Sequence, residues 1–223
     1  MTKDRGDDHY NRHLLDVVPP GRRRVVEVGP AHGAFAKALR QRFAGVHITG
    51  VDIDPDYARL AARSCDRVFV CDIEAVDEAA FSALFPSDCW VFGDSLEHLR
   101  DPWRLLAAVR RRIDPDGCVV TCIPNAQHWS VQARLAAGEF HYEDEGLLDR
   151  THLRWFTRKT MLAMFGQAGW RVEQTVMRGL THPGPAPVLE AVRRLAEAVG
   201  ADPREALADC QVFQYVFRLV PRS

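Results

Sequence analysis

The sequence predicts an α/β fold in which short parallel strands alternate with helices. Apolar runs of four to six residues recur along the chain, and segments with helical spacing of their apolar residues separate these runs. Strands that are apolar throughout are typical of a sheet covered by helices on both faces. The first unit is the clearest: the run 24–28 leads into the turn 29–33, a helix follows, and a second strand is followed by Asp52.

Boundary residues justify the other elements in order. Pro19-Pro20-Gly21 stops a short first helix, Pro55 and Pro102 each open a helix in its first turn, and Thr157 caps another that Gly169 ends. We expect strands at residues 24–28, 46–51, 67–71, 89–92, 118–123, 170–177 and 211–220. We expect helices within residues 10–18, 33–43, 55–63, 77–84, 102–112, 157–168, 188–199 and 203–208.

Two segments interrupt the alternation. Residues 124–156 follow the fifth strand and carry several aromatic side chains and the acidic run 143–145. Residues 181–209 place two helices before the last strand. A chain of 223 residues with 47% hydrophobic residues can bury one good core, so we interpret both segments as insertions in a single domain spanning residues 1–223.

Composition narrows the functional classes. The net charge of -1 gives no indication of electrostatic binding to nucleic acid or to an anionic membrane. None of the six cysteines forms a C-x-x-C pair, which favours buried thiols in a reducing compartment. The chain has no apolar leader and no run of about 18 apolar residues, so we expect a cytoplasmic protein without a membrane span.

The turn after the first strand excludes two nucleotide sites. A dinucleotide fingerprint would need glycine at positions 29, 31 and 34, but the chain has Gly29, Ala31 and Ala34. The backbone therefore cannot approach a pyrophosphate closely, which argues against a nicotinamide oxidoreductase. A phosphate-binding P-loop is excluded because no Gly-Lys-Ser/Thr follows. The acid Asp52 still stands where a ribose diol would be bound.

What remains is an acid-x-Gly-x-small-x-Gly pattern, followed by acids after strands two and three. This pattern, together with Asp88-Cys-Trp-Val-Phe-Gly-Asp-Ser-Leu-Glu-His-Leu-Arg-Asp-Pro102 and Asp149-Arg-Thr-His-Leu-Arg-Trp-Phe-Thr157, resembles class I S-adenosylmethionine-dependent methyltransferases. The resemblance covers residues 10–220 and favours the ubiquinone-type and antibiotic-sugar-type branch. It implies a Rossmann-like seven-stranded mixed sheet with the last strand antiparallel, and helices on both faces. It also implies a lid helix at 9–20, an acceptor-side insertion at 124–156 and a helical insertion at 181–209.

The resemblance also implies a cofactor site for S-adenosylmethionine, which has a cationic sulfonium and no phosphate. Gly29 and Gly33 let the turn approach the methionine part, and Ala31 narrows the pocket where glycine is common. Further roles are implied for Glu27 (the turn and the ammonium), Asp52 (the ribose), Ile53 and Ile73 (beside adenine), Asp72 (the adenine amine), and Asp94 and Ser95 (the sulfonium side).

On the acceptor side, His152 is the expected general base and Asp149 the residue that orients its ring. We expect His98 to be structural or on the cofactor side. Methyl transfer requires no metal in principle, and we predict none. The residues expected around the acceptor are Tyr10 (a lid), His128, Trp129 and Tyr142.

These expectations add up to methyl transfer from S-adenosylmethionine to a hydroxyl of a small molecule, a sugar or secondary-metabolite scaffold. N-methylation of an aminosugar is the alternative, since the acidic run 143–145 could face a cation. A second alternative is a methyltransferase-like partner subunit without activity. The helices of 188–208 would then form its docking surface, and they could equally serve as a substrate lid or a homodimer contact.

Overall fold

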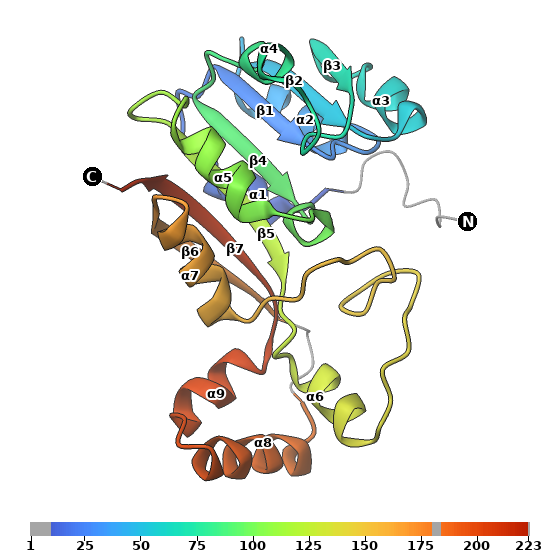
Figure 1. Cartoon of the computed structure of the whole chain (residues 1–223), viewed down its shortest axis with the longest axis vertical. Coiled ribbons are helices and arrows are strands. Elements are labelled where there is room, and N and C mark those ends of the chain that lie inside the picture. The colour runs from blue at the N-terminus through green and yellow to red at the C-terminus, as the bar shows by residue number, and fades with distance from the viewer. Residues whose placement is uncertain (1–9, 180–183, 223) are drawn as a thin grey trace.

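The computed structural model describes residues 10–179 and 184–222 of the chain. The centre is a seven-stranded sheet of order β3-β2-β1-β4-β5-β7-β6 (Figure 1). β7 pairs antiparallel with β5 and β6, and the other neighbours are parallel. This confirms the mixed sheet with an antiparallel last strand. The strands are β1 (Arg24–Val28), β2 (His47–Asp52), β3 (Arg67–Val70), β4 (Cys89–Gly93), β5 (Cys118–Pro124), β6 (Trp170–Gly179) and β7 (Val212–Pro221).

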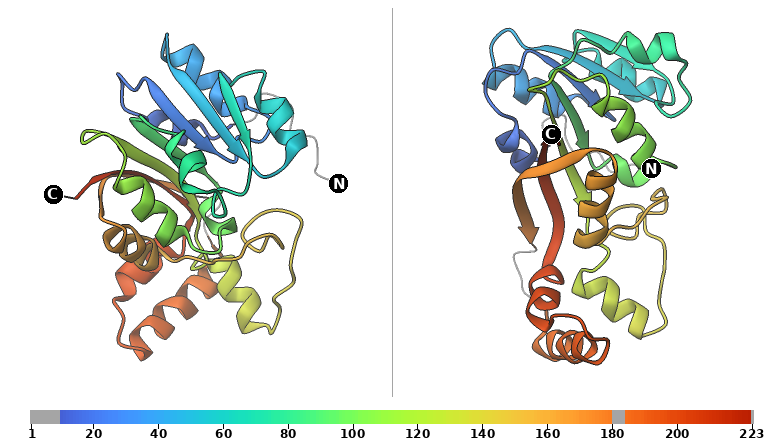
Figure 2. Two further views of the ribbon diagram at one scale, coloured as in Figure 1. Left: turned by 45° about the horizontal axis from the view of Figure 1, so that its top comes forward. Right: turned by 60° about the vertical axis from the view of Figure 1, so that its left-hand side comes forward.

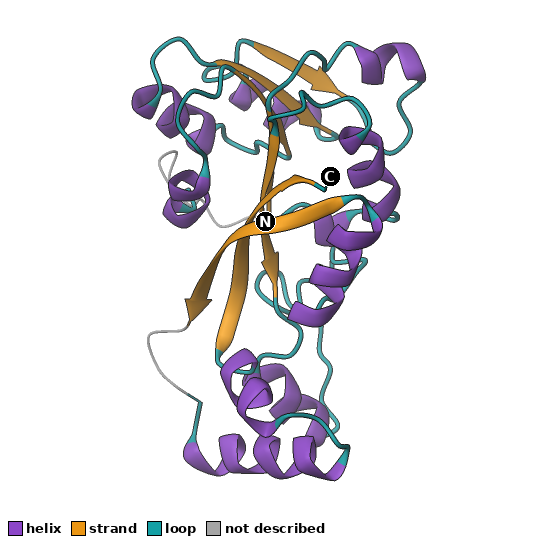
Figure 3. Ribbon diagram, turned by 90° about the vertical axis from the view of Figure 1, so that its left-hand side faces the viewer, coloured by secondary structure: helices purple, strands orange, loops and turns teal. Residues whose placement is uncertain are grey.

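Helices cover both faces of the sheet, as the apolar strands require (Figure 3). One face carries α1 (Arg12–Val17), α2 (Ala34–Arg42) and α3 (Pro55–Ala61). The other carries α4 (Glu78–Ser82), α5 (Pro102–Arg110) and α7 (Arg158–Gln167). Because side chains alternate along a strand, β4 serves both cores: Trp90 and Phe92 face the second set, whereas Cys89 and Val91 face the first.

The topology fixes the place of the site. β1 and β4 are neighbours in the sheet, but the helices that follow them, α2 and α5, lie on opposite faces. The chain therefore diverges beyond the carboxyl ends of these strands, which is where open α/β sheets bind ligands. A Cβ atom built on Gly29, after β1, would lie 3.6 Å from the Cβ of Ser95, after β4. The two loops thus meet at this edge.

A group of three helices extends past the carboxyl end of β5 (Figures 1 and 2). They are α6 (Trp129–Ala136), α8 (Ala186–Ala198) and α9 (Pro203–Asp209). The buried amide of Asn125 anchors this region, because its Nδ2 donates to the carbonyl oxygens of Asp209 and Val212, both at 2.8 Å. The α6 helix belongs to the expected insertion 124–156, and α8 and α9 belong to the expected insertion 181–209. Residues 181–183 of the second insertion, and His9 of the expected lid helix, fall outside the described residues.

The sequence pattern misses α6. We interpreted residues 124–156 as an insertion and predicted no helix there, but His128 starts a helix by accepting a hydrogen bond from the backbone N–H of Ser130. Two buried interactions fix it: Trp129 N–H donates to the Cys210 carbonyl at 2.7 Å, and Val131 enters a small cluster with Leu148. No helix within the described ranges is long and apolar enough to cross a membrane.

Candidate active site

The turn after β1 is built from left-handed backbone. Gly29, Ala31 and Gly33 have φ values of 74°, 48° and 76°, in the region that favours glycine. The turn closes through the Gly33 N–H to Pro30 carbonyl bond at 2.8 Å, and Gly29 N–H donates to Val51 of β2 at 2.9 Å. Ala31 holds this conformation with a side chain, which costs about 1 kcal/mol. The alanine at position 31 therefore strains the backbone of the turn, in addition to narrowing the pocket.

Glu27, on β1 beneath this turn, is a buried carboxyl group. It is 5% exposed, and its Oε2 has no hydrogen-bond partner among the described residues. Burial, and secondarily the charge of Asp52, raise the pKa of Glu27 to about 8. A buried acceptor without a donor fits a cationic group such as an ammonium, which would supply both hydrogen bonds and charge.

Asp52 lies at the end of β2, next to the turn. Its Oδ1 accepts from the N–H of Asp54 at 3.0 Å, and its Oδ2 accepts from the N–H of Ala31 at 3.4 Å. The two contacts hold the carboxylate between β2 and the glycine turn while leaving lone pairs for a diol. Ile53, the next residue, is 69% exposed, so a flat ring could cover it. These positions agree with the ribose and adenine roles that the resemblance implies, which remain predictions.

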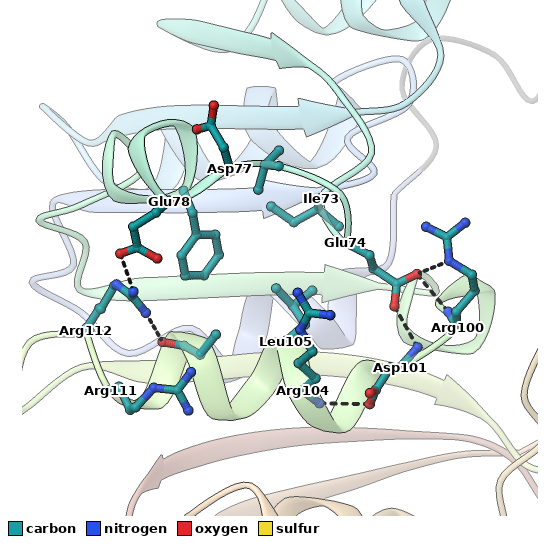
Figure 4. A pocket seen from close by; sticks show the side chains of 13 residues that line it. Ile73, Glu74, Asp77, Glu78, Arg100, Asp101, Arg104, Leu105, Arg111 and Arg112 are labelled. Atoms are coloured by element: carbon teal, nitrogen blue, oxygen red, sulfur yellow. Dashed lines mark hydrogen bonds and ion pairs between the residues drawn. The ribbon is translucent and has the colours of Figure 1, made fainter.

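Asp72 and Ile73 follow β3. Asp72 forms an ion pair there with Arg100, a residue that we did not single out from the sequence. Glu74 accepts from the backbone N–H groups of Arg100 and Asp101 at 2.8 and 2.6 Å (Figure 4). Burial would raise the pKa of Asp72, but the hydrogen bonds and charge of Arg100 outweigh it and lower the pKa. Ile73 is 7% exposed and lines a cavity of about 320 Å³ between α4 and α5.

Asp94 and Ser95 follow β4 and face the glycine turn. Asp94 has a φ of 56°, and its Oδ1 accepts from Nε2 of Gln214 on β7 at 2.5 Å. The Ser95 hydroxyl is buried without a partner among the described residues. A positive φ at Asp94 and an unpaired hydroxyl on Ser95, both at a ligand-binding edge of the sheet, are typical of residues that contact a bound ligand.

The histidines gather one turn further on. Glu97 and His98 belong to the short 3-10 helix η1 (Leu96–His98), and His152 lies on the loop before α7. The His98 and His152 rings are 4.9 Å apart, and His152 Nε2 lies 4.0 Å from Oε1 of Glu97. His98, expected to be structural or on the cofactor side, is thus a direct neighbour of His152.

Asp149 does not pair with His152 as expected. Its Oδ1 accepts from the N–H and the hydroxyl of Thr151 at 2.7 and 2.6 Å, a local turn that the Asp-x-Thr spacing favours. The Thr151 carbonyl and hydroxyl oxygens each lie 3.1 Å from Nδ1 of His98. Asp149 therefore supports His98 through Thr151, whereas it acts on His152 by charge alone, raising its pKa against burial.

The other expected acceptor-side residues separate into two groups. His128 caps α6, its ring is buried against Phe213, and burial lowers its pKa to about 4, so it is neutral. Trp129 packs on Gly184, where a Cβ would come within 2.8 Å of the indole. His128 thus holds the start of α6 against β7, whereas Trp129 holds it against Gly184, before α8, and against the end of α9. Tyr10 is half-buried against the core under α1.

Tyr142 belongs to an exposed aromatic cluster with Phe140 and Trp155. The three rings contact one another at centroid distances of 5.7, 6.0 and 6.3 Å. Their exposed fractions are 39% for Phe140, 55% for Tyr142 and 39% for Trp155. His152 lies between Phe140 and Trp155 in the sequence, so the cluster belongs to the same chain segment as His152.

A Rossmann-like sheet with an antiparallel last strand, a glycine turn after β1 and carboxylates placed for a cationic, phosphate-free cofactor defines a class I methyltransferase that uses S-adenosylmethionine. Comparison with known proteins gives the family. Residues 4–175 match the model of the methyltransferase domain family, and the chain belongs to that family.

Individual relatives agree. A malonyl-[acyl-carrier protein] O-methyltransferase of Geobacter sulfurreducens is 26% identical over 181 residues, which cover 77% of this chain and 65% of that protein. The solved structure of a candidate methyltransferase of Bacillus halodurans C-125 superposes with a TM-score of 0.62 at 14% identity, covering 95% of this chain and 98% of the other. An O-methyltransferase of a Brevibacillus brevis polyketide multienzyme, with bound S-adenosyl-L-homocysteine, superposes with a TM-score of 0.60 at 14% identity, covering 95% and 71%.

The buried carboxyl group of Glu27 leads to a prediction about how stability depends on pH. Its pKa is about 8 when folded and 4.5 when unfolded, so the folded chain keeps a proton that the unfolded chain loses between these values. The stabilisation is full below pH 4.5 and is lost as the pH rises to about 8. We expect the free energy of unfolding of Glu27→Gln, relative to the wild type, to rise by roughly 3–5 kcal/mol across this window in urea titrations. The exposed Glu139→Gln is the control, and a pH-independent difference for Glu27→Gln would contradict the prediction.

Proposed function

We propose that the protein transfers the methyl group of S-adenosylmethionine to a hydroxyl of a small molecule, a sugar or a secondary-metabolite scaffold. One observation carries the proposal: two buried carboxyl groups, Glu27 and Asp52, offer acceptors beside a turn with no phosphate-binding glycine pattern. Two of the similar proteins are described as O-methyltransferases, which supports an oxygen acceptor.

When bound, S-adenosylmethionine supplies an electrophilic methyl group on a positively charged sulfur. The chain's own residues mainly align the partners of an in-line displacement. Gly29 and Asp52 hold the cofactor side, and Asp94 and Ser95 line the edge between the two loops. A neutral hydroxyl is a weak nucleophile, so its proton must be removed. We assign this to the histidine pair, with His152 as the proton acceptor because burial lowers its pKa and thereby favours the neutral ring.

The exposed aromatic cluster of Phe140, Tyr142 and Trp155 supports a flat or ring-shaped acceptor. Exposed rings in mutual contact offer apolar area at low entropic cost, and sugars and planar scaffolds pack on such faces. Its residues belong to the segment that carries His152. Tyr142 thereby keeps its role as an acceptor-binding residue in the proposal, whereas His128 and Trp129 act through the position of α6.

The structure weakens the argument for N-methylation of an aminosugar, which was that the acidic run 143–145 could face a cation. Glu143 pairs with Arg134 at 2.7 Å, and Asp144 pairs with Arg150 at 2.7 Å, so these two acids already have cationic partners. The alternatives of a partner subunit without activity and of a homodimer rest on the helices of 188–208, where Leu195 of α8 and Val199 at its C-cap are 59% and 69% exposed. The amine and partner-subunit alternatives become outcomes of the following experiment.

The experiment incubates the purified protein with methyl-labelled S-adenosylmethionine and fractionated extract of its producer, and identifies the labelled product by mass spectrometry and NMR. We expect the label on an oxygen of a small molecule. Label on nitrogen would replace the oxygen proposal by the amine alternative. Cofactor binding without any labelled product, in fractions that a known methyltransferase labels, would favour the partner-subunit alternative.

A further inference from the structure

Three residues with metal-ligating side chains converge at the carboxyl edge of the sheet. One ligand atom of each of Glu97, His98 and His152 lies within 4.8 Å of those of the other two. Glu97 and His98 are adjacent on η1, and His152 approaches from the loop before α7. The loop is held in place by its backbone, because the Leu153 and Arg154 N–H groups both donate to the Glu97 carbonyl at 2.9 Å.

The Glu97 carboxyl group is buried without a hydrogen bond to another described residue. It is 1% exposed, and within the described ranges neither of its oxygens meets a hydrogen-bond donor of another residue. Burial, and then the charge of Asp94, raise its pKa well above the usual value. A buried carboxyl with two free oxygens is unfavourable unless a proton or a cation compensates it.

The two histidines are prepared as ligands. His98 Nδ1 lies 3.1 Å from the carbonyl oxygen of Thr151, so Nδ1 carries the proton and Nε2 is free to coordinate. Behind it, Thr151 donates to Asp149 at 2.6 Å. On the other side, the Leu147 backbone hydrogen-bonds to the His152 ring and orients it. Imidazoles that bind metals are oriented in this way by carbonyl and carboxylate partners.

We propose that Glu97, His98 and His152 bind one divalent transition-metal cation of the Zn²⁺ type. Two imidazoles and one carboxylate form the N₂O donor set of metal sites that keep a position for substrate, and Mg²⁺ and Ca²⁺ prefer oxygen-only sets. This inference replaces the expectation that no metal is involved. It also gives the orphaned Glu97 oxygens a partner.

The inference rests on the proposed function for its role in the reaction. A cation held by three protein ligands would keep a coordination position for the acceptor oxygen. A hydroxyl bound there would release its proton to solvent water, and the O–CH₃ bond would form as the S–CH₃ bond breaks and the sulfur becomes a neutral thioether. His152 is then a ligand, and the direct base role of the preceding section is the competing outcome.

Metal binding is tested without reference to turnover. The untagged protein is stripped with a chelator, dialysed, and titrated with ZnCl₂, CoCl₂ and MgCl₂. We expect one Zn²⁺ per chain by calorimetry, visible absorption bands with Co²⁺, and a rise in Tm of about 5 to 10 °C at a Zn²⁺ concentration 100 times Kd. Absence of Zn²⁺ and Co²⁺ binding, or an equal response to Mg²⁺, would overturn the proposal.

Variants assign the site. Glu97→Gln keeps the size of the side chain and the backbone contacts to residues 153 and 154, and should weaken Zn²⁺ binding by at least about 100-fold. Because it removes a buried carboxyl without partners, it should also raise the Tm of the metal-free protein. His98→Ala should lose the Co²⁺ spectrum even if Glu97→Gln folds poorly. His13→Ala, which removes an exposed histidine of α1, is the matched control. Zn²⁺ affinity that survives both site variants would refute the assignment.

Affinity for S-adenosylmethionine and methyl transfer are measured on the same preparations. Stripped protein that binds the cofactor and methylates at the full rate would overturn the metal inference and leave the proposed function intact. Protein that binds Zn²⁺ through Glu97 but never transfers a methyl group would refute the proposed function and leave the metal site standing.

Discussion

Asp52→Ala is expected to abolish binding of S-adenosylmethionine while the chain still folds. The carboxylate lies at the end of β2, fixed by two backbone N–H groups, and the resemblance gives it the ribose hydroxyls. Each hydrogen bond to a charged acceptor contributes about 1.5–3 kcal/mol, so losing two weakens binding at least about 100-fold. Isothermal titration calorimetry measures the loss, and circular dichroism checks the fold.

Two further variants serve as controls for this prediction. Asp52→Asn keeps one acceptor oxygen and should retain part of the affinity. Asp56→Ala removes another acid of the same region, an exposed residue in the first turn of α3 that pairs with Arg59, and should bind normally. Unchanged affinity in Asp52→Ala would mean that the cofactor lies elsewhere and would refute the site.

The elements that the sequence predicts correctly are those whose signal is local. Apolar strand runs, Pro55 and Pro102 at helix starts, and Thr157 with its capping box all recur in the structure within a few residues. The proximity of the residues expected on the cofactor side was predictable for the same reason. Parallel strands bring their carboxyl ends to one edge, so the order of Glu27, Asp52 and Asp94 along the chain already places them together.

The parts that the sequence does not reveal depend on contacts between distant segments. The α6 helix is capped by His128 and held by Cys210, about 80 residues away along the chain. Asp149 was paired with His152 by proximity in sequence, but a two-residue turn to Thr151 satisfies it first. In the sequence, Arg100 is marked only by its place in the segment from Asp88 to Pro102. The fold is needed to show that it pairs with Asp72 and Glu74.

The strain at Ala31 also cannot be predicted from the sequence. The motif alone shows an alanine in place of glycine, which suggests only a smaller pocket. The backbone shows that the residue keeps a positive φ in spite of its side chain, because Gly29 and Gly33 on either side and the Asp52 carboxylate hold the turn. Strain at a ligand-binding edge is stabilised by the surrounding structure, and the hydrogen bond from Ala31 to Asp52 is part of that support.

His152→Ala is expected to lower turnover by about 100-fold or more without weakening the binding of S-adenosylmethionine. The side chain lies among Glu97, His98 and the Leu147 backbone, and the proposal places it on the acceptor side, so its loss should affect the acceptor and not the cofactor. Steady-state kinetics measures kcat, and calorimetry measures the cofactor affinity on the same variant. A merely structural role would lower both together.

Added imidazole separates the two ways in which His152 can act. If the ring accepts the proton of the acceptor hydroxyl directly, imidazole should restore part of the rate in His152→Ala without any metal. If the ring holds a cation with Glu97 and His98, the rate should depend on Zn²⁺ and a chelator should abolish the rescue. The exposed His13→Ala should behave as the wild type in every arm. Full activity of His152→Ala would remove this histidine from the reaction altogether.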